Sequence, residues 1–208
     1  MKDLFQLRYT ALIQAWQRGL ARETAHAGAA FVIVAVFFYA ACLLLPQVRE
    51  ALVGLVLSVM GSMPITQEDG TLSALGLLSN NLQACAFIMV YGLIPFLRLP
   101  ALTLGINAMV LGVLAAQYTV EGISLFVYLA LLLPHGIFEL PAITLALGTG
   151  LYVCTQLTRR CRKQPDALPL WDCLLLISRV LLLAVLPLLC AAALMEAYVT
   201  PLLASLFL

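Results

Sequence analysis

Residues 173–196 read CLLLISRVLLLAVLPLLCAAALME, an almost unbroken run of apolar side chains. A helix needs about 20 apolar residues to cross the hydrocarbon core of a lipid bilayer. Backbone N–H and C=O groups find no water in that core, so a spanning segment must satisfy them internally, as a helix does. The sequence therefore predicts a membrane-spanning helix here.

Four more runs of this kind precede it along the chain. The five predicted spans are 28–46, 80–97, 100–117, 137–157 and 173–196. Two further apolar stretches, about 48–60 and 123–134, are too short to cross, and we expect short helices that lie at an interface or dip in and return. The expected fold is all-α: a polytopic helical membrane protein with five full spans, interfacial helices and a short re-entrant helix.

The composition also indicates a chain whose solvent is lipid. Apolar residues fill 63% of its 208 positions and charged residues only 10%, whereas soluble domains carry roughly a quarter charged residues. A net charge of +1 and the absence of any Gly-rich phosphate loop argue against binding to nucleic acids or nucleotides. We expect the lipid bilayer as the surrounding partner and no cofactor.

Basic residues concentrate on one side of the predicted spans. They are Lys2, Arg8, Arg18 and Arg22 before the first span, Arg98 between the second and third, and Arg159, Arg160, Arg162 and Lys163 between the fourth and fifth. Positively charged connections stay in the cytoplasm, so we expect the N-terminus inside and the C-terminus outside the plasma membrane. Residues 1–26, with large apolar side chains every three or four positions, are predicted to form a cytoplasmic amphipathic helix ahead of a single transmembrane domain, 27–208.

The segment 133–141, LPHGIFELP, interrupts the apolar sequence with helix-breaking and ionisable residues. Pro134 and Pro141 lack a backbone N–H and Gly136 permits unusual turns, so we expect the helix to break between the re-entrant piece and the fourth span. His135 and Glu139 are four residues apart and would lie on one face of a helix.

Polar side chains within apolar spans cost several kcal/mol unless they are paired or hydrated, and they therefore mark a candidate site. The candidate polar or ion site comprises Asn80, Asn81, Asn107, His135, Glu139 and Glu196. With the orientation above, all but Asn107 fall in the outer third of the membrane. This group is either a proton or cation site or a structural cluster that fastens helices together. One histidine and two glutamates could also hold a metal ion, although no ligand spacing demands it.

Small residues recur every four positions in two of the spans. They are Ala108, Gly112 and Ala116 in the third span, and Ala142, Ala146 and Gly150 in the fourth. Such faces allow helix backbones to approach closely in lipid. We expect them to pack against helices of the same chain or, alternatively, against a second copy in a homo-oligomer.

Several stretches taken together resemble a known family. They are Asn80-Asn81-Leu82, Gly105-Ile106-Asn107, the PHGIFELPAI stretch 134–143, and Glu196-Ala197-Tyr198-Val199-Thr200-Pro201. Over residues 80–208 the chain resembles the stage II sporulation protein M family of integral membrane proteins. In the sporulating members, this resemblance implies a membrane partner of peptidoglycan-cleaving proteins that itself cleaves nothing.

Two functional hypotheses follow. The first is a non-enzymatic membrane scaffold in cell-envelope remodelling, which recruits other membrane or envelope proteins. The second is a small transporter or channel in which His135, Glu139 and Glu196 form a proton or cation site at the broken helix.

Overall fold

The structure is a computed structural model that describes residues 9–10, 12–61 and 73–207, all of which lie in helices or in the connections between them. The helices are η1 (Trp16–Leu20), α2 (Ala21–Leu44), α3 (Pro46–Gly61), α4 (Ala74–Tyr91), α5 (Pro100–Val120), α6 (Leu125–Cys161), α7 (Leu170–Val180), η2 (Leu181–Val185), α8 (Leu186–Leu194), η3 (Met195–Val199) and α9 (Thr200–Phe207). Residues 62–72, between α3 and α4, lie outside the described residues, as do Lys2 and Arg8 of the predicted N-terminal helix.

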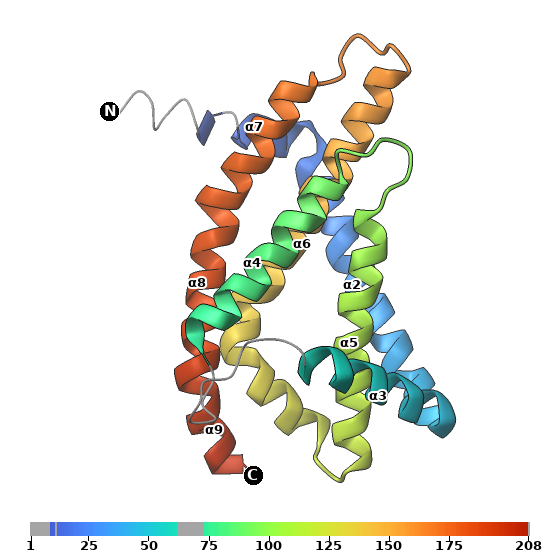
Figure 1. Cartoon of the computed structure of the whole chain (residues 1–208), viewed down its shortest axis with the longest axis vertical. Helices are drawn as coiled ribbons and strands as arrows, with labels where there is room; N and C mark the ends of the chain where they lie inside the picture. The colour runs from blue at the N-terminus through green and yellow to red at the C-terminus, as the bar shows by residue number, and fades with distance from the viewer. Residues whose placement is uncertain (1–8, 11, 62–72, 208) are drawn as a thin grey trace. The chain divides into compact units, whose positions relative to one another are not determined.

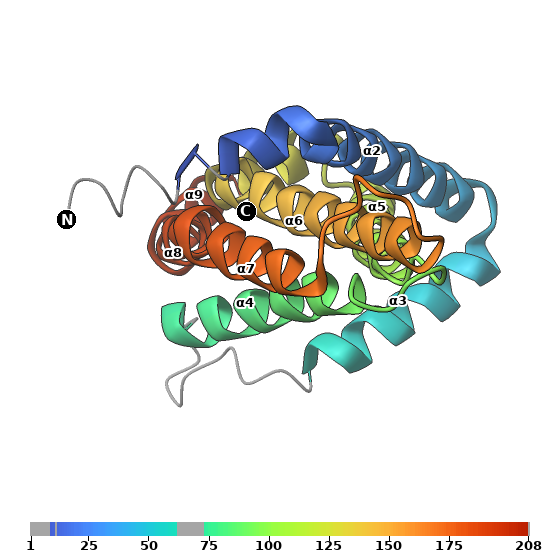
Figure 2. The ribbon, with the colours of Figure 1, turned by 90° about the horizontal axis from the view of Figure 1, so that it is seen from above.

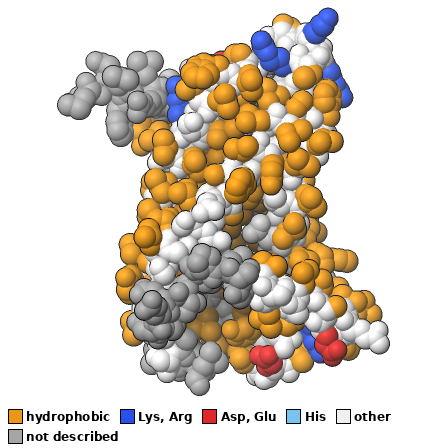
Figure 3. All heavy atoms as spheres, in the orientation of Figure 1, with side chains coloured by type: hydrophobic (Ala, Val, Ile, Leu, Met, Phe, Trp, Pro, Cys, Tyr) orange, Lys and Arg blue, Asp and Glu red, His pale blue; other side chains and the backbone are white. Residues whose placement is uncertain are grey.

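Within the described residues, five helical stretches are long and apolar enough to cross a membrane. They are Leu12–Leu44, Ala74–Tyr91, Pro100–Val120, Leu125–Cys161 and Leu170–Leu203. The predicted all-α, multi-pass membrane fold is therefore confirmed. Apolar side chains cover most of the face shown in Figure 3. Among the described residues, several large apolar side chains, including Ile33, Phe37 and Phe126, are more than 60% exposed. Such a surface is suited to lipid.

The first crossing helix contains a kink near its start. Gly19 has a φ of 128°, a conformation that only glycine adopts readily, and α2 begins two residues later at Ala21. The helical stretch Leu12–Leu44 therefore kinks at Gly19, inside the predicted N-terminal segment 1–26, and the predicted boundary at residue 26 stays a prediction. Trp16 is 46% exposed whereas Leu20 is buried, so the helix has a covered side and an open side.

The predicted break at the proline-rich motif is wrong. Residues 125–161 form one continuous helix of 37 residues, α6, and Pro134, Gly136 and Pro141 all lie inside it. Each proline removes a single backbone hydrogen bond, and membrane helices tolerate this loss because neighbouring groups satisfy the freed carbonyl. Most of the predicted re-entrant helix, 123–134, thus forms the first part of α6 and is not a separate short helix. By contrast, the short helix predicted at about 48–60 is present as α3.

The helices contribute to two compact units. Unit 1 contains the described parts of Met1–Ala29, Leu82–Leu104 and Pro141–Leu188, and unit 2 contains those of Ala30–Asn81, Gly105–Leu140 and Leu189–Leu208. Each unit therefore gathers pieces of several helices that are distant in sequence.

The core of unit 2 is formed where α2, α3 and α5 meet. Cys42 of α2, Val56 of α3, and Val113 and Ala116 of α5 make one buried apolar cluster. Figure 1 shows α3 crossing α5 at this level. A side chain on Gly112 would collide with the backbone carbonyl oxygen of Ala35 in α2. The two backbones pack this closely because position 112 has no Cβ.

Close backbone contacts also hold unit 1 together. A Cβ on Gly150 of α6 would lie 2.7 Å from the carbonyl oxygen of Ile88 in α4 and 2.9 Å from Cγ of Pro100, the first residue of α5. The six small residues predicted to face other helices are all buried: Ala108, Gly112, Ala116, Ala142, Ala146 and Gly150. Gly112 and Gly150 thus contact helices of the same chain.

The close contact at Gly112 is open to a direct test. We expect Gly112→Ala to lower the free energy of unfolding by about 1–3 kcal/mol, because the new methyl group overpacks against α2. Gly105→Ala is the matched control in the same helix, since nothing lies within 4 Å of its added Cβ. The control should leave stability unchanged or raise it by about 0.5–1 kcal/mol. Thermal unfolding of the purified proteins in detergent measures both, and equal effects would contradict the described packing.

Candidate functional site

Three ionisable side chains of unit 2 come together within the described structure. His135 and Glu139 lie one turn apart on α6, and Glu196 belongs to η3, near the end of the last crossing helix. One ligand atom from each residue, a ring nitrogen or a carboxylate oxygen, lies within 4.8 Å of the other two. All three side chains are half-buried. We call these residues the polar triad.

The helical geometry explains how α6 presents two members of the triad. Residues four apart in an α-helix lie on the same face, one turn above the other. An unbroken α6 gives this spacing directly. The continuous helix therefore places His135 and Glu139 on one face, as their four-residue spacing predicts.

Glu196 lies in a π-helical turn. In η3 the backbone N–H of Thr200 donates to the carbonyl oxygen of Met195, five residues earlier, in place of the usual four. Such a turn adds one residue to the helix and changes the direction of the side chains that follow, and π turns are frequent at functional sites. The irregular backbone thus coincides with the third member of the triad.

Thr200 is a contact of the site that the sequence analysis missed. Its Oγ1 lies 3.3 Å from Nδ1 of His135, within hydrogen-bond distance, and 3.4 Å from the carbonyl oxygen of Met195. Its position four residues after Glu196 is the signal that could have identified it, because that spacing places both on one side of the helix. Thr200 helps to fix the orientation of the imidazole ring.

The two asparagines of α4 approach the triad from a third element. The side chain of Asn81 hydrogen-bonds the carboxylate of Glu139. Asn80 in turn donates from Nδ2 to Oδ1 of Asn81, over 3.5 Å. Asn81 therefore contacts the site directly, and Asn80 contacts it through Asn81.

Asn107 is less closely tied to this group. It is half-buried in α5, belongs to the same unit and takes part in a polar interaction. No described contact connects it with the triad, so its role in the site stays a prediction.

The donor set of the triad suits a divalent cation. Imidazole nitrogen and carboxylate oxygen bind Zn²⁺ and similar metals at about 2.0–2.2 Å, which puts tetrahedral ligands about 3.4 Å apart. Small side-chain rotations would bring the three ligand atoms from their present separations to such distances. Two carboxylates held this close also repel each other in an apolar setting, and a bound cation removes that repulsion.

A comparison with known protein families gives a match that covers most of the chain. Residues 27–201 match the family model described as Stage II sporulation protein M. The chain belongs to the stage II sporulation protein M family. The match confirms the resemblance found over 80–208 and extends it toward the N-terminus, through α2 and α3. No curated protein and no solved structure matches this chain.

The proximity of α6 and η3 can be tested by cross-linking. In a Cys161→Ser background we expect the double variant Glu139→Cys/Glu196→Cys to be joined efficiently by a short bifunctional maleimide, because the two native side chains converge. Ile137→Cys/Glu196→Cys is the control, since the side chain of Ile137 is 62% exposed and two residues out of register with the triad. Mass spectrometry of the linked peptides gives the readout. Equal yields for the two pairs would mean that residues 139 and 196 do not face each other.

Proposed function

We propose that this protein is a non-enzymatic membrane scaffold in cell-envelope remodelling and that its polar triad binds a divalent cation. The convergence of three ligand atoms within 4.8 Å of one another is the observation that carries the cation site. Membership of the stage II sporulation protein M family supports the scaffold role. The expected partners are other membrane or envelope proteins, or a second copy of the chain.

A cation at the triad would act on the arrangement of the helices. Its ligands come from α6 and η3, and Asn81 connects Glu139 to α4. One bound ion would therefore hold three helical elements that are far apart in sequence. A scaffold needs this kind of fixed arrangement, because its partners must meet a surface of constant shape.

One part of the transport hypothesis, the broken helix at the site, differs from the structure. In many transporters a discontinuous helix exposes backbone groups to the ion or substrate. Residues 125–161 form an unbroken helix instead, so the triad consists of side chains alone. The geometry favours a cation that fastens helices over one that passes between them.

Metal binding to the purified protein tests this proposal. We expect wild-type protein in detergent to bind Zn²⁺ alone and to gain thermal stability from it, by about 2.7 kcal/mol when Zn²⁺ is present at 100 times its dissociation constant. Glu139→Gln keeps the shape of the side chain but removes a charged ligand, so we expect at least about tenfold weaker binding.

Glu121→Gln provides the matched control for this experiment. Glu121 follows the end of α5, is exposed and accepts a hydrogen bond from Gln117 at 2.7 Å, away from the triad ligands. Its replacement should leave Zn²⁺ affinity unchanged. If wild type and both variants respond equally to Zn²⁺, the triad is a structural cluster and the proposed cation site is excluded.

We also propose that the N-terminus lies in the cytoplasm and the C-terminus outside. Cys161 is exposed beside Arg160 and Arg162, whereas the other five cysteines are buried or half-buried. In intact cells, a membrane-impermeant maleimide should therefore leave the protein unlabelled, and a permeant maleimide should label it. Ser205→Cys, an exposed site in α9, should be labelled by the impermeant reagent in a Cys161→Ser background. The opposite pattern would invert the topology.

A further inference from the structure

Unit 1 contains a second polar site that shares no residue with the triad. It is a cavity of about 410 Å³ lined by Arg18, Tyr152, Gln156, Arg159, Asp166 and Leu168. Arg18 comes from η1, the next three residues from α6, and the last two from the connection between α6 and α7. This volume lies within the range of small-ligand sites in proteins.

Two of the residues that line the cavity, Tyr152 and Gln156, are buried and held in place by neighbouring groups. Tyr152 is only 3% exposed, and its ring lies against Gly19, where an added Cβ would be 3.6 Å from Cε2. Gln156 is 5% exposed, and its Oε1 accepts a hydrogen bond from the backbone N–H of Leu168, at 3.3 Å. The connection that carries Asp166 is thereby tied to α6.

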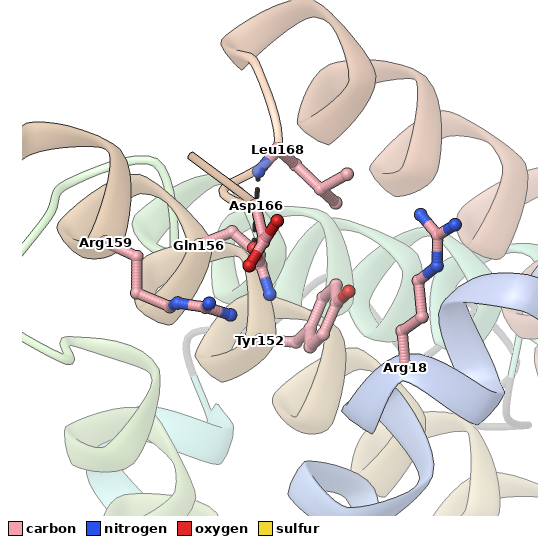
Figure 4. Close-up of a pocket in the computed structure, with 6 residues that line it drawn as sticks. All are labelled: Arg18, Tyr152, Gln156, Arg159, Asp166 and Leu168. Carbon is pink, nitrogen blue, oxygen red and sulfur yellow. Dashed lines mark hydrogen bonds between the residues drawn. The ribbon is translucent and has the colours of Figure 1, made fainter. Parts of the chain in front are cut away.

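The charged groups surround the cavity without neutralising one another. Figure 4 shows Arg18 and Arg159 on opposite sides, with Tyr152 between them and the carboxylate of Asp166 near Gln156. Among the described residues, neither arginine forms an ion pair with Asp166. Nε of Arg159 donates to Oε1 of Gln164 at 2.6 Å, which orients this guanidinium and leaves its terminal N–H groups for a ligand.

This arrangement selects a ligand that carries both signs of charge. Two guanidinium groups match a phosphate, because each offers paired N–H donors to its oxygens. The single carboxylate matches an ammonium group, whose N–H bonds it can accept. A phosphate joined by a short linker to a primary ammonium, as in phosphoethanolamine, satisfies both requirements.

The surroundings of the cavity indicate a lipid as the source of that group. Trp16, two residues before Arg18, is 46% exposed, and Leu170 and Trp171, just after Leu168, are 52% and 67% exposed. Exposed tryptophan at the end of a spanning helix is typical of the membrane–water interface. Acyl chains attached to a headgroup in the cavity would find apolar side chains beside it.

We propose that this cavity binds the phosphoethanolamine headgroup of a phospholipid. Arg18 and Arg159 hold the phosphate, Asp166 accepts hydrogen bonds from the ammonium group, and the amide of Gln156 and the hydroxyl of Tyr152 line the space between them. The site gives the protein a preference for phospholipids with this headgroup, bound between η1, α6 and the connection that follows α6.

Lipid retention in native mass spectrometry tests this proposal with the full chain. The purified protein is exposed in detergent to phosphatidylethanolamine, phosphatidylcholine or phosphatidylglycerol with identical acyl chains. We expect phosphatidylethanolamine to be retained several-fold better than the other two. The choline headgroup offers Asp166 no N–H donor, and the glycerol headgroup offers it no positive charge.

Substitutions separate a specific site from general attraction to arginines. Arg159→Gln should abolish the preference, and Asp166→Asn should weaken phosphatidylethanolamine retention while improving that of phosphatidylglycerol. Arg160→Gln is the matched control, because this exposed arginine is adjacent on α6 and does not line the cavity. Melting temperatures equal to that of wild type establish that each variant is folded.

Two outcomes would overturn the inference. Retention of phosphatidylglycerol at least as strong as that of phosphatidylethanolamine, unaffected by Asp166→Asn, would make the cavity a general anion site. Displacement of the bound lipid by free phosphoethanolamine at an equal concentration would show that the acyl chains contribute nothing and that the natural ligand is a soluble molecule.

Discussion

The cost of placing ionisable groups among apolar helices is the constraint on which this structure depends. A charged side chain in a bilayer costs several kcal/mol unless a partner, water or an ion compensates it. The chain compensates this free-energy cost by grouping three half-buried ionisable side chains. His135, Glu139 and Glu196 meet one another, and Asn81 and Thr200 supply hydrogen bonds. The same grouping ties α4, α6 and η3 together in unit 2.

The parts of the fold that the sequence predicts are those set by hydropathy and spacing. Long apolar runs fix the number of spans, and the four-residue spacing of His135 and Glu139 holds because α6 is a regular helix there. The predicted break fails for a physical reason. Proline and glycine lower helical stability, but the rest of a long span still favours the helix, since lipid offers its backbone no other partners.

Other features depend on tertiary structure and have no clear local signal. Nothing in the sequence of Met195–Val199 marks a π turn. The spacing of Thr200 from Glu196 could have placed it near the site, but its contact with His135 depends on the packing of the last helix against α6. The cavity around Tyr152 illustrates the same limit. Arg18 and Asp166 look like ordinary surface charges in the sequence, and only the folded chain brings them to one space with Arg159.

The π turn in η3 determines which side chains the last helix presents to its neighbours. Each residue of an α-helix advances the chain by about 1.5 Å and rotates it by about 100°. One additional residue at Met195–Val199 therefore changes the span's length very little, yet it turns every later side chain to a new azimuth. A relative that lacks this residue would cross the same thickness of lipid while presenting a different stripe of its last helix to the rest of the fold. An insertion or deletion of one residue within Met195–Val199 would thus alter the site as much as a replacement of Glu196.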